Sequence, residues 1–214
     1  TIGDPANEKV RMGAIVNKSQ VDVVRNRVLE MSQKTPIVFG DLDKFEVIGA
    51  DANKGFFLPP ILMLNENPLI NTDSHDIECF GPVSTLMPYT GIEEAITLAK
   101  MGKGSLVSSI VTNDNAIAKA YTISAATHHG RILILNRESA KQSTGHGSPL
   151  PSLVHGGPGR AGGGEEMGGV RGIKHYLQRT AIQGSPTTLT EITGIYQPNS
   201  KYKEAAQHPF KYHW

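Results

Sequence analysis

Val83-Ser-Thr-Leu-Met-Pro-Tyr89 is the first of three short apolar runs that decide the fold of this sequence, and the other two are Leu106-Val-Ser-Ser-Ile-Val111 and Ile132-Leu-Ile-Leu135. All three are rich in residues that favour strands, and none alternates cleanly between apolar and polar positions. Such runs are typical of strands that are covered on both faces. Between them, apolar residues recur at helical spacing over 92–99 and 117–121.

The resulting order is β-α-β-α-β, and connections of this length favour parallel strands joined by right-handed crossovers. We therefore expect residues 82–136 to form the centre of an α/β fold, with an open, mainly parallel sheet and helices on both faces. The polar cluster at residues 112–115 is expected to cap the second helix.

Upstream of this centre, the pattern predicts one helix and three further strands. Val21, Val24, Val28 and Met31 recur at helical spacing, and Ser19 is placed to cap the helix start. The strand-like runs are separated by turn residues, which favours an antiparallel extension of the sheet. These runs cover residues 37–39, 45–48 and 56–63.

Downstream of Asn136 the sequence changes in character. A long stretch rich in Ser, Gly and Pro leads to residues 156–169, where eight of fourteen positions are glycine. Loops this long in a compact domain are usually functional or closely packed. A predicted helix over residues 170–177, a strand-like run from Arg179 to Gln183 and a polar tail complete the chain.

The composition excludes several classes of protein. The 214 residues carry 21 Lys and Arg against 20 Asp and Glu, so nothing electrostatic favours nucleic acid or an anionic membrane as a partner. No apolar run approaches the roughly 20 residues that span a bilayer. The single cysteine, Cys79, excludes an internal disulfide and suits a reducing compartment such as the cytoplasm. The first residues lack signal-peptide order and an initiator Met, so we expect a piece of a longer protein.

Common site motifs are weak or absent. Gly157-Pro-Gly-Arg-Ala-Gly162 has the GxGxxG spelling of a dinucleotide-binding turn. No clear strand precedes it and no acidic residue follows about 20 positions later, which favours a closely packed loop. The eight histidines lack the spacing of zinc ligands, and the GxSxG elbow of hydrolases does not occur. We therefore expect no metal site.

The segment Asp76-Ile-Glu-Cys-Phe-Gly-Pro-Val83 directly precedes the first central strand and resembles the E-x-F-G-P-V segment of the aldehyde dehydrogenase superfamily. The resemblance runs from Ile2 to about Gln183 and implies a catalytic-domain sheet of the aldehyde dehydrogenase type. Further pieces agree in order and spacing: Ile2-Gly-Asp-Pro5, Met12-Gly13, Phe57-Leu-Pro-Pro60, the strand ending at Asn136, and Gly156-Gly157.

Residues further downstream resemble one subgroup of this superfamily in particular. The stretches from His155 to Glu166 and from Lys174 to Pro186, with His208-Pro-Phe210, are similar to the dehydrogenase domain of the PaaZ-like bifunctional enzymes of phenylacetate degradation. Dehydrogenases for coenzyme A semialdehydes from aerobic benzoate degradation share much of this pattern. His155 stands where the general family has Phe, so the pocket of general family members is a poor guide to this loop.

In this family a cysteine thiolate adds to the aldehyde, hydride passes to the nicotinamide, and a glutamate-activated water hydrolyses the thioester. The resemblance places both residues, and the nucleotide-binding strands, upstream of Ile2. It therefore implies the C-terminal half of a dehydrogenase that uses NADP or NAD, with no catalytic residue in this chain. The implied substrate is a small aldehyde, more specifically a coenzyme A-linked semialdehyde.

The resemblance also assigns residues to sites. Glu78 would accept hydrogen bonds from the ribose hydroxyls on the nicotinamide side, because a carboxylate accepts from two donors. Phe80 would pack against the same ribose, and Asn136 and His155 would line the substrate pocket. Each residue also has a plainer alternative role. Glu78 would be a solvated acid, Phe80 a core residue, Asn136 a strand-end residue and His155 an ordinary loop histidine.

Cys79 is not expected to be the nucleophile. In an extended segment, Glu78 and Phe80 point to one side and Cys79 to the other. The adjacent Glu78 carboxylate would raise the pKa of the thiol, which opposes formation of the thiolate. We expect Cys79 to pack as a small apolar side chain.

Two parts of the chain are expected to differ in role. Residues 1–178 would belong to the catalytic domain, and residues 179–214 to an oligomerisation strand and tail. The run from Arg179 to Gln183 would pair between subunits of a homo-oligomer, because it has no remaining partner in this chain. An alternative function is a non-catalytic half-domain that serves oligomerisation or ligand binding.

Overall fold

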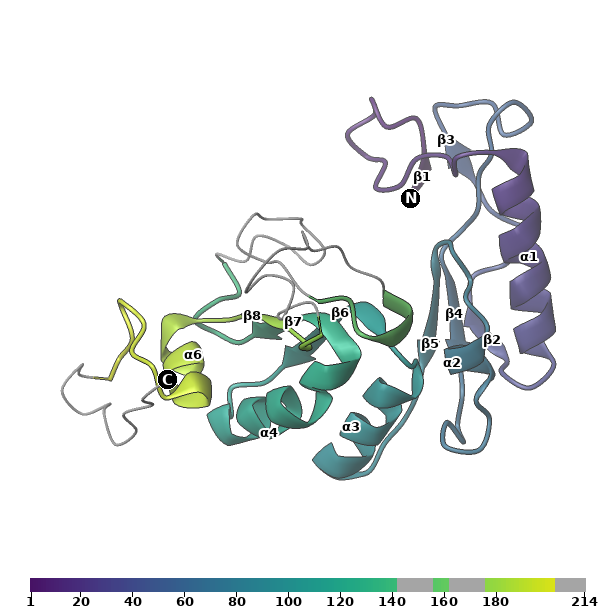
Figure 1. Cartoon of the computed structure of the whole chain (residues 1–214). Coiled ribbons are helices and arrows are strands. Elements are labelled where there is room, and N and C mark those ends of the chain that lie inside the picture. Colours follow the sequence, from purple (N-terminus) through teal and green to yellow (C-terminus); the bar gives the residue numbers. More distant parts are fainter. Residues whose placement is uncertain (142–155, 162–175, 203–214) are drawn as a thin grey trace. The chain divides into compact units, whose positions relative to one another are not determined.

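The computed structural model describes residues 1–141, 156–161 and 176–202 of the chain (Figure 1). Contacts between residues divide the chain into two units, Thr1–Tyr89 and Thr90–Trp214, which are described in turn. Strands and helices alternate along the chain and most strand pairs are parallel, so the predicted α/β class is confirmed.

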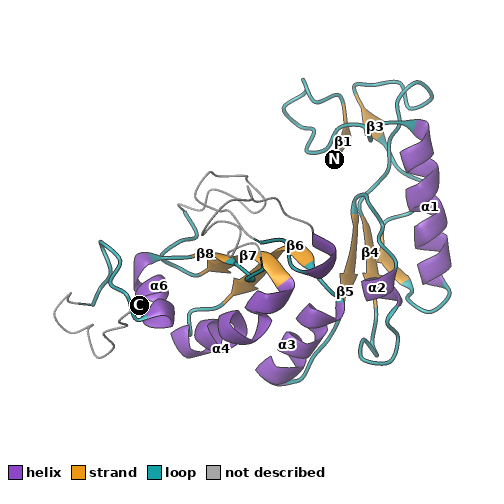
Figure 2. Ribbon diagram, viewed as in Figure 1, coloured by secondary structure: helices purple, strands orange, loops and turns teal. Residues whose placement is uncertain are grey.

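The first unit contains a three-stranded sheet and one long helix (Figure 2). The strand order is β2-β4-β5, with β2 antiparallel and β5 parallel to the central strand β4. A separate pair, β1 and β3, is parallel. The elements are β1 (Ile2–Gly3), α1 (Lys18–Ser32), β2 (Ile37–Phe39), β3 (Val47–Ile48), β4 (Ile61–Leu64), α2 (Asp73–Asp76) and β5 (Val83–Leu86).

Helix α1 covers this sheet with an apolar stripe. Val24, Val28 and Met31 are at most 2% exposed and pack with Leu58 and Met63 in one cluster. The helix starts earlier than predicted, because Asn17 has extended backbone and its side chain accepts a hydrogen bond from the Gln20 backbone N–H over 2.8 Å. Ser19 already lies inside the helix, so its predicted capping role is wrong.

The second unit contains a parallel sheet with the order β6-β7-β8, drawn side by side in Figure 1. Its core cluster joins α3, α4 and β7 through Ile96, Tyr121, Ile132 and Ile134. The elements are α3 (Gly91–Met101), β6 (Ser105–Val111), α4 (Asn115–Ala125), η1 (Ala126–His128), β7 (His129–Leu135), η2 (Gly159–Ala161), β8 (Ala181–Gln183) and α6 (Pro186–Thr193).

The expected cap of the second central helix is confirmed. The Asp114 carboxylate accepts from the backbone N–H groups of Ala116 and Ile117, over 2.8 and 3.2 Å. These bonds satisfy two of the donors that the first turn of α4 leaves open.

The strands predicted over residues 82–136 are divided between the two units, and each has a parallel partner within its own unit. Strand β5 pairs with β4 in the first unit, from Ile61 opposite Val83 to Leu64 opposite Leu86, while β6 pairs with β7 in the second unit. The segment between β4 and β5 contains α2 and supplies the crossover that a parallel pair needs, so the neighbour of β5 comes from upstream. Similarly, β3 pairs in parallel with β1 rather than in an antiparallel extension.

Only one central strand is covered as the sequence pattern predicted. Six of the seven residues of β7 are buried. By contrast, Leu86 at the end of β5 is 50% exposed, and Leu106 and Val111 of β6 are 57% and 78% exposed in the chain alone. The apolar sequence of β5 and β6 therefore does not mean that all of its apolar side chains are buried within this chain.

Two features of the C-terminal region differ from expectation. Strand β8 pairs with β7, with Ala181 opposite Arg131, so the premise that the run from Arg179 has no partner in this chain is wrong. The tail also contains α6, whose N-cap Ser185 accepts from the Thr188 N–H and whose C-cap Gly194 has a φ of 69°. That left-handed conformation favours glycine. The predicted helix over residues 170–177 lies almost entirely outside the described residues.

Candidate functional site

The segment that carries Glu78 and Phe80 joins α2 to β5 in the first unit. Both residues are exposed, and Phe80 is 74% exposed. Cys79 between them is half-buried and packs against the α1 core, with Sγ 3.5 Å from the Met31 Sδ. The alternation expected of extended backbone is therefore present, and the two residues predicted to bind the cofactor are presented together.

The environment of Cys79 opposes nucleophilic chemistry. Burial raises the pKa of the thiol; Arg27 lowers it and Glu30 raises it, both with smaller effects. The prediction that Glu78 would raise this pKa is wrong, because the charges that act on the thiol lie on α1. The thiol stays protonated at neutral pH and packs as a small apolar group.

Asn136 lies at the end of β7 and binds the start of α6. Its Nδ2 donates to Ser185 Oγ over 3.2 Å and to Thr188 Oγ1 over 2.9 Å. Its Oδ1 accepts from the backbone N–H groups of Glu138 and Ser139, both over 3.0 Å. Both ends of the amide are therefore occupied within the chain, and the residue has a structural role whether or not it also contacts a substrate.

Two neighbouring pockets open beside Asn136, at the carboxyl ends of β6 and β7. Both pockets are lined by Asn113, Asn136 and Arg137. Ligands of parallel α/β sheets commonly bind at this edge. A polar pocket of about 380 Å³ adds Asn115, Glu138, Thr187, Thr188 and Lys201, and an apolar one of about 440 Å³ adds Val111, Thr112, Leu135 and Ala140.

The charged groups of the polar pocket differ in their pairing. Glu138 forms an ion pair with Lys201, and hydrogen bonding to Lys201 is the largest cause that holds the pKa of this carboxyl below its usual value. Arg137 is exposed, and its guanidinium forms no ion pair or hydrogen bond with the residues that the structure describes. The polar pocket therefore contains one cation in an ion pair, Lys201, and one cation, Arg137, whose guanidinium has no partner among the described residues.

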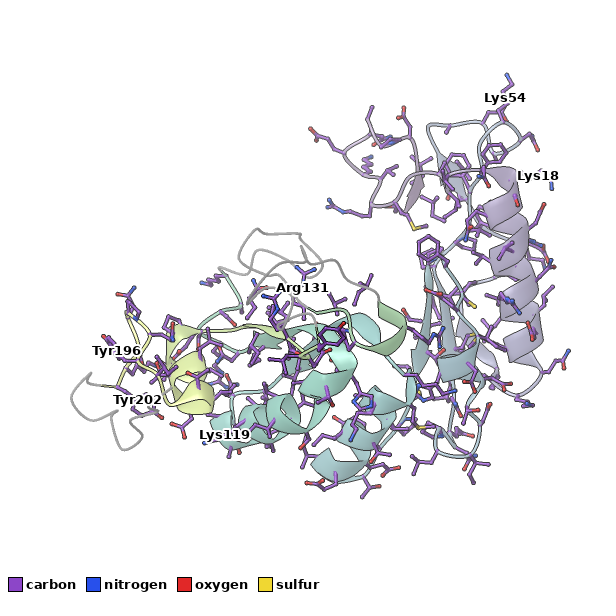
Figure 3. All side chains as sticks on the ribbon, viewed as in Figure 1. Lys18, Lys54, Lys119, Arg131, Tyr196 and Tyr202 are labelled. Atoms are coloured by element: carbon purple, nitrogen blue, oxygen red, sulfur yellow. The ribbon has the colours of Figure 1, made fainter. Side chains whose placement is uncertain are left out.

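The last described residues are held against α6. The Tyr202 hydroxyl donates to Glu191 Oε2 over 2.6 Å, and the backbone N–H of Lys201 donates to Thr187 Oγ1 over 3.1 Å. Figure 3 labels Tyr202 and Tyr196 in this region. These contacts bring Lys201 to the wall of the polar pocket.

Sequence reasoning missed two residues with clear structural signals. Gln20 of α1 donates from Nε2 to the Phe80 carbonyl over 2.7 Å, a contact between residues 60 positions apart. His129 at the start of β7 is 3% exposed and stacks on Tyr121, with ring centroids 6.5 Å apart. Burial lowers the pKa of His129, and the charge of His128 adds to that effect.

Some of the predicted site residues are not among the residues that the structure describes. His155 lies outside the described residues, as does most of the glycine-rich stretch. Over residues 1–141, 156–161 and 176–202, no group of three His, Cys, Asp or Glu side chains is arranged to hold a metal ion. None of the helices in the same ranges is long and apolar enough to cross a membrane.

Comparison with known proteins decides the family. Residues 1–182 match the sequence model of the aldehyde dehydrogenase family. The chain belongs to that family. It is 46% identical over 201 residues to "Protein MaoC" of Klebsiella aerogenes, covering 94% of this chain and 58% of that protein.

A second relative is an aldehyde dehydrogenase that is named for its substrate. The 3,4-dehydroadipyl-CoA semialdehyde dehydrogenase of Aromatoleum evansii is 35% identical over 157 residues, covering 73% of this chain and 30% of that protein. The chain therefore spans 58% and 30% of the lengths of these two curated relatives. Its similarity to PaaZ-like and coenzyme A semialdehyde dehydrogenases is confirmed.

Solved aldehyde dehydrogenases share the fold. A putative methylmalonate-semialdehyde dehydrogenase of Sinorhizobium meliloti, solved with NAD, aligns with a TM-score of 0.61 at 23% identity, over 83% of this chain and 33% of that one. Aldehyde dehydrogenase C of Pseudomonas syringae, solved as a mutant with NAD+ and octanal, aligns with a TM-score of 0.60 at 24% identity, over 82% of this chain and 32% of that one.

Proposed function

We propose that this chain is the C-terminal portion of an NAD(P)-dependent aldehyde dehydrogenase that oxidises a coenzyme A-linked semialdehyde to the acid in aerobic degradation of phenylacetate. The observation that carries the proposal is the joint exposure of Glu78 and Phe80 on one side of their segment, with Cys79 packed on the other. In this proposal the nucleophile and the general base lie outside the 214 residues.

The two exposed residues fit the nicotinamide-side ribose of the cofactor. The Glu78 carboxylate can accept from both ribose hydroxyls at once, and charge-assisted bonds of this kind are stronger than neutral ones. The Phe80 ring offers an apolar face beside the same sugar. When bound, the nicotinamide accepts the hydride that leaves the substrate, and the role of this chain is to limit where the ring can lie.

The proposed substrate class rests on the relatives and on the pocket beside Asn136. One relative is named for a coenzyme A semialdehyde. In this chain the open guanidinium of Arg137 lies on the wall shared by a polar and an apolar pocket. An aldehyde that carries an anionic carrier group presents the same two properties, and Arg binds phosphate well. Asn136 and His155 remain proposed pocket residues.

Glu78→Gln in the complete dehydrogenase tests the cofactor role. The change keeps the shape and removes the charge, so the dissociation constant for NAD(P) should rise by about five- to 150-fold, the equivalent of 1 to 3 kcal/mol. Acylation of the catalytic thiol by an activated ester, which releases its alcohol and needs no hydride transfer, should persist. Glu66→Gln, another exposed carboxylate of the first unit, is the matched control and should leave the constant unchanged.

The alternative function is a non-catalytic half-domain. The observation that favours it is that the only thiol of the chain, Cys79, is packed against the core and has a raised pKa. The coding sequence immediately upstream separates the two functions. An open frame with a glycine-rich nucleotide fold and a cysteine supports the enzyme, and a start codon at the boundary supports the half-domain.

Assembly and location are further parts of the proposal. Strand β8 is the edge strand of β6-β7-β8 in the described residues, so its outer side can pair with a second copy although its inner side binds β7. We propose a homo-oligomer in the cytoplasm. Sedimentation of the complete protein tests the oligomer, and a monomer at micromolar concentration would contradict it.

A further inference from the structure

The wall of the polar pocket beside Asn136 comes from two parts of the chain. Arg137 and Glu138 follow β7 and belong to the part that matches the aldehyde dehydrogenase model. Thr187 and Lys201 belong to the α6 segment, residues 185–202, which lies beyond that match. All of these residues are in the second unit. The pocket is therefore completed by a segment that the family match does not include.

The α6 segment is held firmly against the rest of the second unit. Helix α6 packs against α4 (Figure 1). Ser185 and Thr188 are buried and accept from the Asn136 amide, as described above. The Thr187 hydroxyl accepts from the Lys201 backbone N–H over 3.1 Å, which brings the end of the segment back to its start. A wall that is fixed in this way can be formed before a ligand binds.

The charged side chains of the pocket leave an excess of positive charge. Arg137 and Lys201 contribute two positive charges and Glu138 one negative charge, so the formal sum is +1. Lys201 is paired with Glu138, whereas the Arg137 guanidinium has no partner in the part of the chain that the structure describes. A pocket with excess positive charge attracts an anion.

The neutral side chain beside Arg137 adds hydrogen-bond donors rather than acceptors. The Asn113 Oδ1 accepts from the backbone N–H of Arg137 over 3.1 Å, so the oxygen of this amide is occupied. The amide nitrogen of Asn113 keeps its two donors, and the side chain lines the pocket. A planar guanidinium next to an amide donor matches the several acceptor oxygens of a phosphate group.

The neighbouring apolar pocket limits the shape of the anion. It shares Asn113 and Arg137 with the polar pocket and adds Leu135 and Val111, of which Val111 is 78% exposed. A phosphate at Arg137 would therefore have room beside it for an uncharged part of the same molecule. Free inorganic phosphate would leave that apolar surface uncovered.

We propose that this polar pocket binds a phosphate group of the coenzyme A carrier, with Arg137 as a specificity-determining residue for the substrate and the α6 segment as the wall that sets the charge around it. The inference rests on the proposed function, because it needs a substrate that is linked to coenzyme A. Lys201 has a separate role from Arg137, since it cancels the charge of Glu138, which would otherwise repel the phosphate.

The test uses the complete dehydrogenase, with NAD as the cofactor and a buffer free of phosphate. It compares the coenzyme A-linked semialdehyde with the same semialdehyde as a thioester of N-acetylcysteamine, which carries no phosphate. Arg137→Gln should lower the ratio of the two kcat/KM values about tenfold, and Arg137→Lys, which keeps the charge without the planar fork, about threefold. Lys119→Gln removes an exposed cation of α4 that lies outside the pocket lining (Figure 3) and should leave the ratio within about twofold.

The ion pair provides a second test, because its two members should act in opposite directions. Lys201→Met leaves Glu138 unpaired and should lower the ratio about threefold, whereas Glu138→Gln raises the formal sum to +2 and should raise it about threefold. The double variant restores a sum of +1 and should return the ratio to within about twofold of the wild type. A merely structural ion pair would give shifts in the same direction, since both variants break the same contact.

Three results would overturn the inference. The first is a wild-type preference for the coenzyme A thioester that persists in Arg137→Gln, and the second is a shift in the same direction for Lys201→Met and Glu138→Gln. The third is a KM for NADP that rises in Arg137→Gln while the ratio stays unchanged, which would assign the bound phosphate to the cofactor. If the wild type itself shows no preference for the coenzyme A thioester, the proposed substrate class fails instead, so the two failures are distinguishable.

Discussion

The side-chain amide of Asn136 donates to Thr188 Oγ1 over 2.9 Å and thereby ties the end of β7 to a helix turn 52 residues later. Thr188 extends this hydrogen-bond network. Its hydroxyl accepts from Ser185 Oγ and donates to Asn115 Oδ1, each over 2.9 Å. Ser185 and Thr188 are 3% and 1% exposed. The junction of β7, α4 and α6 is therefore a buried polar network with a fixed direction of donation.

Asn136→Ala should destabilise the protein by about 2 to 4 kcal/mol, because it removes a donor to two buried hydroxyls and the acceptor of two backbone N–H groups. Asn136→Asp should also destabilise, since a carboxylate would face two hydroxyl oxygens that already donate elsewhere. Urea unfolding measures both. Glu138→Gln is the comparison on the same loop, and its exposed ion pair should be worth less than about 1 kcal/mol. A cost for Asn136→Ala no greater than that of Glu138→Gln would contradict the network.

His129 should make the protein less stable in mild acid. Its pKa in the folded protein is lowered by burial, and in the unfolded chain it titrates near 6.5. The unfolded state therefore binds more protons below about pH 6.5, and stability is lost as the pH falls through that value, by at most about 1.4 kcal/mol per pH unit.

His129→Phe tests this pH dependence. The ring can still stack on Tyr121, so stability should be kept near pH 8 and should fall less steeply below pH 6.5 than in the wild type. His128→Gln changes a half-buried neighbour whose charge has only the smaller effect, and it should keep most of the acid sensitivity. Parallel stability curves for His129→Phe and the wild type would show that other groups cause the loss in acid.

Cys79 should be dispensable for turnover and slow to alkylate. Cys79→Ala removes a small half-buried group that packs against Met31 and should cost on the order of 1 kcal/mol of stability. With its pKa raised by burial, the thiol should react with iodoacetamide much more slowly in the native protein than in urea. A folded Cys79→Ala enzyme without dehydrogenase activity would make Cys79 the nucleophile and refute the proposed half-enzyme.

The isolated 214-residue chain should not oxidise aldehydes with NAD or NADP. In our proposal the nucleophile, the general base and the nucleotide-binding part are outside it, and loss of the nucleophile alone costs several orders of magnitude. Absorbance of the reduced cofactor measures the activity, with mass spectrometry to exclude a full-length contaminant. Saturable turnover by the pure chain would transfer the chemistry to Cys79 or to residues 145–166.

The elements that the sequence predicted are those whose signal is local. Helices α3 and α4 and strands β6 and β7 follow from apolar spacing, and the Asp114 cap follows from the residue type before the helix. Helix α6 had local signals as well, Ser185 at the N-cap and Pro186 directly after it, but its polar composition obscured them.

Strand pairing and the contacts of the cofactor segment could not be predicted in the same way. The pairing of β5 with β4 joins segments separated by α2, and no local pattern marks which upstream strand will be the partner. The bond from Gln20 to Phe80 joins residues 60 positions apart, and no spacing rule marks either partner. The motif match indicated Glu78 and Phe80, but only the folded chain shows what holds them.

The pairing of Arg131 with Ala181 joins residues that are 50 positions apart in the sequence (181 minus 131). The entropy of closing a loop grows only with the logarithm of its length, so doubling the segment would cost about 0.6 kcal/mol. By this rule the length of the connection is a small term in the free energy of the β7–β8 pair. The register of this part of the fold is therefore held by the β7–β8 pairing and by the bonds from Asn136 to Ser185 and Thr188, rather than by the length of chain that joins the two strands.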